Sequence, residues 1–395
     1  MKRKKISYLI TGAFIVSTLS FLAIKTFVPN FFNKVLRNDF SQNAYDAVNK
    51  GDFGEAERIL KENIQKDAGN CITQLYLANV YLEEGYVGKN TVADVSAARK
   101  ILSKLQKENK CQIERADVLM GYSYELEGNM EKAEEYYDDA LKKNSDDPDA
   151  LFHKGRISWF LGDAKEAEDF YLKAESNLSQ KTPEGLKGKI FVALGKLYGS
   201  NGDNVAKVEG YFQKALKETK NKNLKAEIYY NLSSLDFYQK VNFKEAVENG
   251  LKAIEIDPSN DLGYLACARV KVTELSFLKD KTQIKKEDLD KINQYLQMAT
   301  NLNSERAMTQ YWFGQFVFAL GDTSEALKRY EIALTKTEKD DSLGIAEKDF
   351  LKSEIFLAEG IVYMSLDDQE NAKKSLMKAY AFNPVKTSFM IEAMK

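Results

Sequence analysis

The residues best able to do chemistry in this 395-residue chain are its many carboxylates, one histidine and three cysteines. A dense group of acids lies in LGDAKEAEDFYLKA, residues 161–174, which contains Asp163, Glu166, Glu168 and Asp169. Carboxylates gathered in one loop could bind a metal ion, whereas acids spaced along a helix form its solvated outer face. The choice depends on whether this stretch is a ligand loop or one unit of a repeat.

The single histidine, His153, limits the catalytic and metal chemistry that the chain can perform. One histidine leaves none to spare for a triad and excludes a two-histidine metal site. The sequence predicts no strands, so no glycine-rich phosphate loop follows a strand. The stretch DDPD at 146–149 lacks the glycine and the distal glutamate of a calcium-binding loop. We therefore expect no enzyme activity, no cofactor and no bound metal.

Three further stretches repeat the pattern of residues 161–174. They are KGDFGEAERILKEN at 50–63, EGNMEKAEEYYDDA at 127–140 and LGDTSEALKRYEIA at 320–333. In three of the four copies an alanine is followed by tyrosine at i+4 and alanine at i+7, so these residues share one helix face. The trios are Ala133, Tyr137 and Ala140; Ala167, Tyr171 and Ala174; and Ala326, Tyr330 and Ala333. The acids of 161–174 are therefore predicted to face solvent on a helix.

A glycine precedes each trio by twelve residues, at Gly121, Gly155 and Gly314, inside a stretch of apolar periodicity. This spacing predicts a helical hairpin in each copy. A small residue where two helices cross lets the backbones approach, and a large residue on the partner fills the space beside it. With only five prolines and no linker rich in glycine, serine or proline, the chain is predicted to be all-α.

These hairpins resemble the tetratricopeptide repeat family, whose period is 34 residues. Ala133 and Ala167 are 34 residues apart, and GYSYELEGNMEKAEEYYDDA and GQFVFALGDTSEALKRYEIALTKT match the family pattern. Less regular copies extend the resemblance over residues 37–385, giving about nine hairpins. They are marked by Ala56, Ala98, Val208, Ala246, Ile292 and Ala372. The resemblance implies a right-handed superhelical solenoid, closed by a capping helix at residues 386–395.

The amino terminus has the composition of a membrane anchor. Residues 6–24 are nineteen residues without a charge, and as a helix they would span about 28 Å of a hydrocarbon core of about 30 Å. We expect a basic cytoplasmic segment at residues 1–5 and a transmembrane signal-anchor helix at residues 6–28. The basic cluster outweighs the positive charges after the span, which places the solenoid outside the cytoplasm of a single-pass plasma membrane protein. A cleaved signal peptide is the alternative, although no clear A-x-A site follows.

The charge distribution argues against nucleic acid as a partner. The formal charge is −2, and five positive charges lie within residues 1–25, which leaves −7 over residues 26–395. Lysine and arginine alternate with acids along the repeats, so no basic stripe forms to release counterions from phosphates.

The cysteines suggest one disulfide. Cys71 opens the first helix of the second hairpin and Cys111 follows its second helix, so an antiparallel hairpin returns both to the same end. In an exported domain, a bridge closing about 40 residues would contribute roughly 4 kcal/mol by the chain-entropy account. It requires Cα atoms within about 7 Å. Cys267 lies among apolar residues and is expected in the core.

The resemblance also implies where a partner would bind, because first helices of successive hairpins line a concave groove in the family. In the fourth hairpin Phe152, Arg156, Trp159 and Phe160 fall at i, i+4, i+7 and i+8 and share one face. Aromatic residues with an arginine are favoured at binding hot spots. The neighbouring hairpins would continue this line with Tyr122, Leu126, Tyr238, Tyr311 and Phe318. Every solenoid also needs aromatics between its hairpins, so both roles remain open.

We therefore expect a membrane-anchored scaffold that binds protein or peptide partners through its concave groove, in envelope assembly or secretion. A cytosol-facing receptor or co-chaperone for protein targeting would keep the fold and reverse the topology. The lysine and asparagine pair with which chaperone-binding relatives clamp a terminal carboxylate is not seen, since Asn79 has Leu75 a turn earlier. A helical enzyme acting on envelope glycan is a further alternative and would need an acid in a deep cleft.

Overall fold

The computed structural model of the chain describes residues 39–86, 91–108, 113–180, 182, 184–278, 284–340 and 343–384. Every regular element within these residues is an α-helix, which confirms the predicted all-α class. The predicted segments 1–5, 6–28 and 386–395 lie outside the described residues. Among the helices that are described, none combines the length and apolar character needed to span a bilayer.

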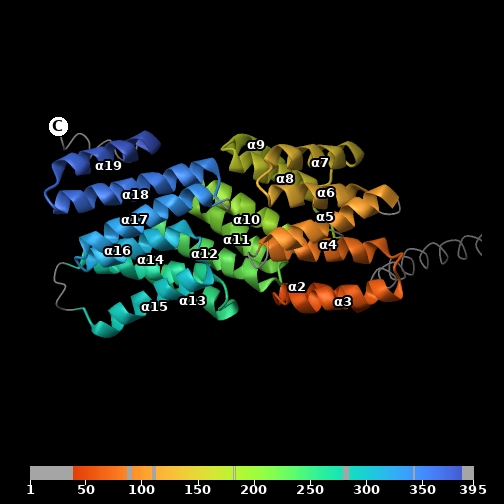
Figure 1. Ribbon diagram of the computed structural model, residues 1–395, viewed down its shortest axis with the longest axis horizontal. Coiled ribbons are helices and arrows are strands. Elements are labelled where there is room, and N and C mark those ends of the chain that lie inside the picture. Colours follow the sequence, from red (N-terminus) through yellow and green to blue (C-terminus); the bar gives the residue numbers. More distant parts are fainter. Residues whose placement is uncertain are drawn as a thin grey trace, which may run out of the picture. The chain divides into compact units, whose positions relative to one another are not determined.

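The chain divides into two compact units, residues 1–111 and 112–395, and both are built from antiparallel hairpins (Figure 1). The first unit contains α2 (Asp39–Asn49), α3 (Phe53–Lys66), α4 (Cys71–Tyr86) and α5 (Thr91–Glu108). The second begins with α6 (Ile113–Glu125), α7 (Met130–Lys143), α8 (Pro148–Phe160), α9 (Ala164–Ser176), α10 (Glu184–Ser200), α11 (Val205–Glu218) and α12 (Lys222–Tyr238). It continues with α13 (Phe243–Ile256), α14 (Asp261–Phe277), α15 (Lys286–Leu302), α16 (Ala307–Ala319), α17 (Thr323–Lys339), α18 (Ile345–Ser365) and α19 (Gln369–Phe382).

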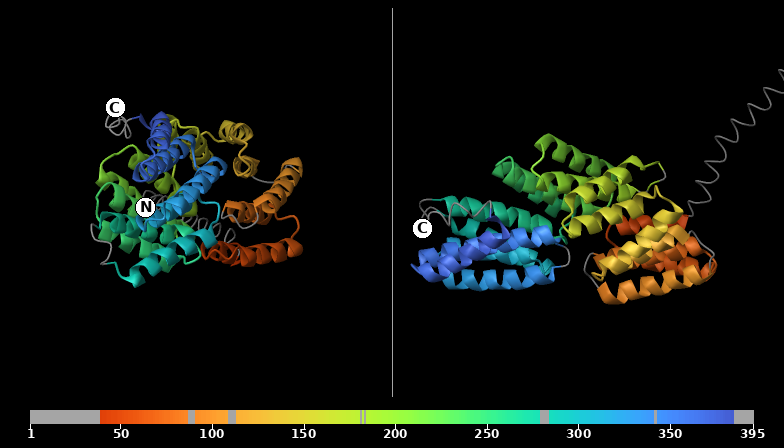
Figure 2. Two further views of the ribbon diagram at one scale, coloured as in Figure 1. Left: turned by 60° about the vertical axis from the view of Figure 1, so that its left-hand side comes forward. Right: turned by 90° about the horizontal axis from the view of Figure 1, so that it is seen from above.

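Each even-numbered helix pairs with the odd-numbered helix that follows it, so the eighteen described helices form nine hairpins. In the second unit the second helix of one hairpin also packs on the first helix of the next, as α7 does on α8 and α17 on α18. The colour sequence in Figure 2 follows this stacking from yellow to blue. Each hairpin therefore contacts mainly its neighbours in the chain, which is the defining property of a solenoid.

A recurrent turn joins the two helices of a hairpin. Gly162 has a φ of 89°, a left-handed conformation that glycine adopts without a steric penalty. The Asp163 carboxylate then accepts a hydrogen bond from the backbone N–H of Glu166 at 2.9 Å and caps α9. Glu168 accepts a hydrogen bond from the Tyr198 hydroxyl at 2.8 Å. The acids of residues 161–174 thus cap and link helices rather than form a ligand loop.

Close helix crossings follow the predicted pairing of a glycine with a large side chain. A Cβ atom placed on Gly314 would lie 2.4 Å from Cε1 of Tyr330, so only glycine allows α16 and α17 to approach this closely. The second-helix trio of this hairpin, Ala326, Tyr330 and Ala333, is fully buried. The same contact recurs in five hairpins, as Gly121–Tyr137, Gly155–Tyr171, Gly195–Phe212, Gly314–Tyr330 and Gly360–Leu376.

The apolar core of the second unit is a series of clusters rather than one centre. One cluster joins α6, α7 and α8, another runs from α8 to α12, and a third runs from α14 to α18. Cys267 is free and fully buried, as predicted, and burial raises the pKa of its thiol to about 12.

Gly314→Ala should destabilise the second unit by about 1–3 kcal/mol, because the added methyl overpacks the crossing between α16 and α17. Gly210 on α11 is the matched control, since a Cβ there would meet nothing within 4 Å. Gly210→Ala should stabilise the helix by up to about 1 kcal/mol. Urea unfolding of the two variants measures both effects, and a change of the same sign in both would contradict the close crossing.

Candidate partner-binding face

The four predicted groove residues of α8 do not form one exposed surface. Phe152 is only 4% exposed, and its ring packs 6.0 Å from that of Tyr171 on α9. Phe152 therefore has the packing role, one of the two that the sequence left open, because the second helix of its own hairpin covers it. Arg156, Trp159 and Phe160 are half-buried. Trp159 packs against the core cluster of α8 to α12, as expected for a residue between hairpins.

The remaining predicted groove residues differ in their solvent exposure. Tyr122 and Tyr311 are buried, at 3% and 8% exposure, and Leu126 and Phe318 are half-buried. Tyr238, at the carboxyl end of α12, is 52% exposed. Of the nine predicted groove residues, it is the one that the structure leaves open to solvent.

A buried polar network that the sequence did not reveal joins α6, α7 and α8. The Glu125 carboxylate accepts a hydrogen bond from the Tyr137 hydroxyl at 2.7 Å and lies 2.8 Å from Nδ1 of His153. Arg156 approaches the other carboxylate oxygen at 3.1 Å. Nε2 of His153 lies 3.7 Å from the Asp149 carboxylate. These residues are 12 to 31 positions away from Glu125 in the chain, so only hairpin packing brings them together.

The electrostatics of the network hold Glu125 charged and His153 neutral. Burial alone would raise the pKa of Glu125, but Arg156, His153 and the Tyr137 hydroxyl lower it to about 2. Burial lowers the pKa of His153 despite the neighbouring carboxylate. Neutral His153 then donates its Nδ1 hydrogen to Glu125, which can only accept. Glu125, Tyr137 and His153 are buried and hydrogen-bonded to one another, and Arg156 is half-buried, so the network stabilises the fold.

A second cluster surrounds Tyr238. The guanidinium carbon of Arg269 on α14 lies 5.4 Å from the ring centroid of Tyr230, 5.0 Å from that of Phe237 and 5.2 Å from that of Tyr238, all on α12. Trp312 on α16 contacts Phe237 edge-on at 6.2 Å. We call these five residues the Arg269 cluster. Three successive first helices therefore contribute to one aromatic site with a buried cation.

Tyr238 lies in a recessed position within this cluster. Burial raises the pKa of its hydroxyl although half of the side chain is accessible to water, while Arg269 lowers it. Electrostatic effects on this hydroxyl come from α14 and also from Glu354 on α18. Protein therefore surrounds Tyr238 on several sides while solvent reaches it from another, as expected on a concave face. The sequence identified Tyr238 but gave no sign that Arg269 lies beneath it.

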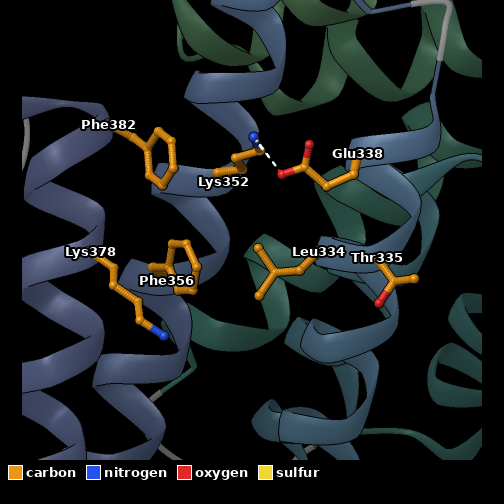
Figure 3. Close-up of a pocket in the computed structure, with 7 residues that line it drawn as sticks. All are labelled: Leu334, Thr335, Glu338, Lys352, Phe356, Lys378 and Phe382. Atoms are coloured by element: carbon orange, nitrogen blue, oxygen red, sulfur yellow. Dashed lines mark ion pairs between the residues drawn. The ribbon is translucent and has the colours of Figure 1, made fainter.

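A small pocket of about 350 Å³ lies between α17, α18 and α19 (Figure 3). It is lined by Leu334, Thr335, Glu338, Lys352, Phe356, Lys378 and Phe382. Lys352 forms an ion pair with Glu338 at 2.6 Å and lies over the Phe382 ring at 5.2 Å. In the fourth hairpin Lys154 likewise pairs with Glu134 at 2.8 Å and lies over Phe170 at 5.5 Å. We interpret the pocket as part of the repeated seam between second helices.

The predicted disulfide involves a residue outside the described part of the chain. Cys71 is disulfide-bonded, and Cys111 lies outside the described residues, so the pairing of these two stays a prediction. Within the described residues there is no group of three histidine, cysteine or acidic side chains placed to hold a metal ion.

Comparison with known families supports the repeat assignment. Family models described as tetratricopeptide repeat match residues 118–182 and 353–386. These segments cover α6 to α9 and α18 to α19, where glycine–large-residue crossings are found. These two segments therefore match tetratricopeptide repeats, as the resemblance predicted for them. A search of curated proteins by sequence finds no match.

Solved structures share the fold at low sequence identity. A monomeric IFIT1 mutant with m7Gppp-AAAA has a TM-score of 0.57 and 15% identity, over 89% of this chain and 80% of IFIT1. The same protein with Gppp-AAAA gives 0.55 and 16%, over 86% and 76%. A tetratricopeptide repeat protein from Parabacteroides merdae gives 0.49 and 16%, over 72% and 99%. At these identities the IFIT1 likeness shows the fold alone.

Glu125→Gln should change how stability depends on pH. Both Glu125 and His153 have folded pKa values below their ordinary values of 4.5 and 6.5, so the unfolded chain binds more protons. The unfolding free energy should therefore fall as pH drops below about 6.5, and again from about 4.5 toward 2. The variant should show a smaller second fall, because other carboxylates with lowered pKa values, such as Glu57, remain. It should also be less stable by about 3 kcal/mol at neutral pH, because buried groups lose their partner.

Urea titrations of the parent and Glu125→Gln proteins at neutral and acidic pH measure this difference. Glu127→Gln is the matched control, because Glu127 is an exposed acid in the turn that follows the same helix. It should keep the pH profile of the parent. Parallel pH profiles in the parent and Glu125→Gln would contradict a charged Glu125 in the folded state.

Proposed function

We propose that this chain is a membrane-anchored scaffold that binds protein or peptide partners on the face formed by its first helices. The anchor is the segment at residues 6–28, and the solenoid acts on the extracytoplasmic side of a plasma membrane, in envelope assembly or secretion. The observation that carries the binding role is Tyr238, a half-exposed aromatic side chain directly over the buried guanidinium of Arg269.

Aromatic and arginine side chains in a recessed position are what protein-binding hot spots favour. A partner that covers the Tyr238 ring gains apolar burial next to Phe237, whose ring lies 4.7 Å from that of Tyr238. The buried acids and the single histidine are engaged in packing and hydrogen bonds, which supports binding rather than turnover.

RNA is the partner found in the IFIT1 structures, which contain cap-like fragments. Residues 26–395 of this chain carry a formal charge of −7, and that excess repels a phosphate backbone. We therefore favour protein over RNA as the partner.

Membrane anchoring explains how a modest peptide affinity would suffice. Tethering through residues 6–28 restricts the solenoid to the surface of the bilayer and raises its effective concentration toward other membrane-bound proteins. The charge asymmetry around this segment supports export of the solenoid.

Replacing Tyr238 with a photo-crosslinking benzoylphenylalanine should yield covalent adducts with protein in native membranes. The matched control is Tyr380, which is 43% exposed but lies on α19, a second helix. Adducts should form at position 238 and be weak or absent at 380, as judged by mass spectrometry after irradiation. Equal adducts at both positions, or adducts with RNA alone, would contradict the proposed binding face.

Deletion of residues 1–28 should release the protein from membranes into the soluble fraction, because it removes the uncharged segment. The full chain should be tested in cells whose outer envelope layer is permeable and whose inner membrane is intact. Protease added to these cells should digest a tag at the carboxyl terminus. The measurement is immunoblotting of fractions before and after protease. Digestion of the tag only after the inner membrane is opened would support the cytosol-facing alternative.

A further inference from the structure

Arg269 is an exception among the cations of the described chain. It is 2% exposed, and no other lysine or arginine among the described residues is as deeply buried. Cations at comparable positions have carboxylate partners, as Arg306 has Asp261 and Lys154 has Glu134. No carboxylate of the described residues forms an ion pair with Arg269, whose hydrogen-bond partners are hydroxyls.

The hydrogen bonds of Arg269 are fewer than its guanidinium can make. Nη1 donates to the Ser234 hydroxyl at 3.0 Å and Nη2 donates to the Ser233 hydroxyl at 3.3 Å, while buried Nε has no partner. A guanidinium has five N–H donors in a fork that matches a carboxylate. Two serine hydroxyls, the hydroxyl of Tyr238 and three aromatic faces offset part of the desolvation cost. The Glu354 charge acts on the adjoining Tyr238 hydroxyl, but no carboxylate of the described residues pairs with the guanidinium itself.

A second donor without a hydrogen-bond partner and a solvent-exposed ring lie next to Arg269. Nε1 of Trp312 is also buried without a hydrogen-bond partner, and its ring contacts Phe237, on which Arg269 lies. Of the three rings around the guanidinium, Tyr238 is the exposed one. Solvent therefore reaches this cluster on the side where Tyr238 lies.

We propose that Arg269 binds a carboxylate of the partner, and that Tyr238 turns aside to admit it and then packs against the bound peptide. This inference rests on the proposed function, since it gives the chemical class of the group that the binding face recognises. One carboxylate supplies one negative charge for one buried cation. A phosphate dianion would leave an excess negative charge buried in an already acidic chain, so a carboxylate is favoured.

The carboxylate has two sources in a protein, namely an acidic side chain and the chain terminus. Three acetylated tetrapeptides with the common sequence Ala-Leu-Ala separate them. One ends in Glu-amide, one in Gln-amide and one in Ala with a free carboxyl terminus. Thermal unfolding of the full-length protein in detergent is followed at millimolar peptide, where a ligand that binds the folded state raises the melting temperature.

We expect a carboxylate peptide to raise the melting temperature and the Gln-amide peptide to have no effect. A rise with the Glu-amide peptide identifies an acidic side chain as the source of the carboxylate. A rise with the free-terminus peptide identifies the chain terminus, and a rise with both shows that either source is bound. Arg269→Met, which keeps an unbranched side chain without the charge, should weaken binding about tenfold or more. Arg329→Met is the matched control, because Arg329 is paired with Glu325 at 2.7 Å and should not affect peptide binding.

Tyr238→Ala removes the covering ring and keeps the test valid if Arg269→Met does not fold. With acetate, a carboxylate that has no peptide for the ring to pack on, this variant should show a larger rise in melting temperature than the parent, because the guanidinium no longer needs the ring to move. Equal stabilisation by the Glu-amide and Gln-amide peptides would overturn the inference. So would an unchanged carboxylate response in Arg269→Met or in Tyr238→Ala.

Photo-crosslinking from position 238 in the Arg269→Met background separates this inference from the proposed function. Loss of the adducts that the parent chain forms is the expected result. Adducts of undiminished yield would overturn the role of Arg269 and leave the scaffold function standing. Absence of adducts in the parent chain would contradict the scaffold function, and the tetrapeptide measurements would still decide whether Arg269 binds carboxylates.

Discussion

The structure depends on how closely the two helices of each hairpin can approach. At Gly314 a single methyl group would collide with the Tyr330 ring, and four other hairpins have the same kind of crossing. Interiors packed to crystal density tolerate neither a gap nor an added atom at such a point. The glycine and its large partner therefore set the hairpin geometry, which in turn fixes where the outward residues of each first helix point.

Polar groups buried by this stacking are of two kinds. The first kind is internally balanced, as in the network where Glu125 meets Tyr137, His153 and Arg156. Each charge in it has a partner, so the network contributes to a specific fold. The second kind is Arg269, which is deeply buried and has only hydroxyls and aromatic rings around it. No carboxylate of the described residues pairs with it, and this difference is the basis of the proposal that Arg269 binds a group of the partner.

The candidate site was partly accessible from the sequence. Helical periodicity correctly placed Phe152, Arg156 and Trp159 on one helix. It could not tell which side of that helix the second helix of the hairpin covers. Phe152 is covered by Tyr171, whereas Tyr238 stays open at the end of α12. Arg269 carried no signal, because an isolated arginine in an apolar stretch has the same sequence context whether or not a carboxylate reaches it.

The sequence by itself determined the helical class, the hairpin unit and the alternation of glycine and aromatic residues, because these follow from local periodicity and side-chain size. The apolar, uncharged character of residues 6–24 is equally a property of the sequence. Only the tertiary structure decided which aromatic side chains are buried and which charges are paired. Those properties depend on contacts between residues up to some 45 positions apart, such as Arg306 with Asp261. Stacking of hairpins sets these contacts, and no single repeat contains them.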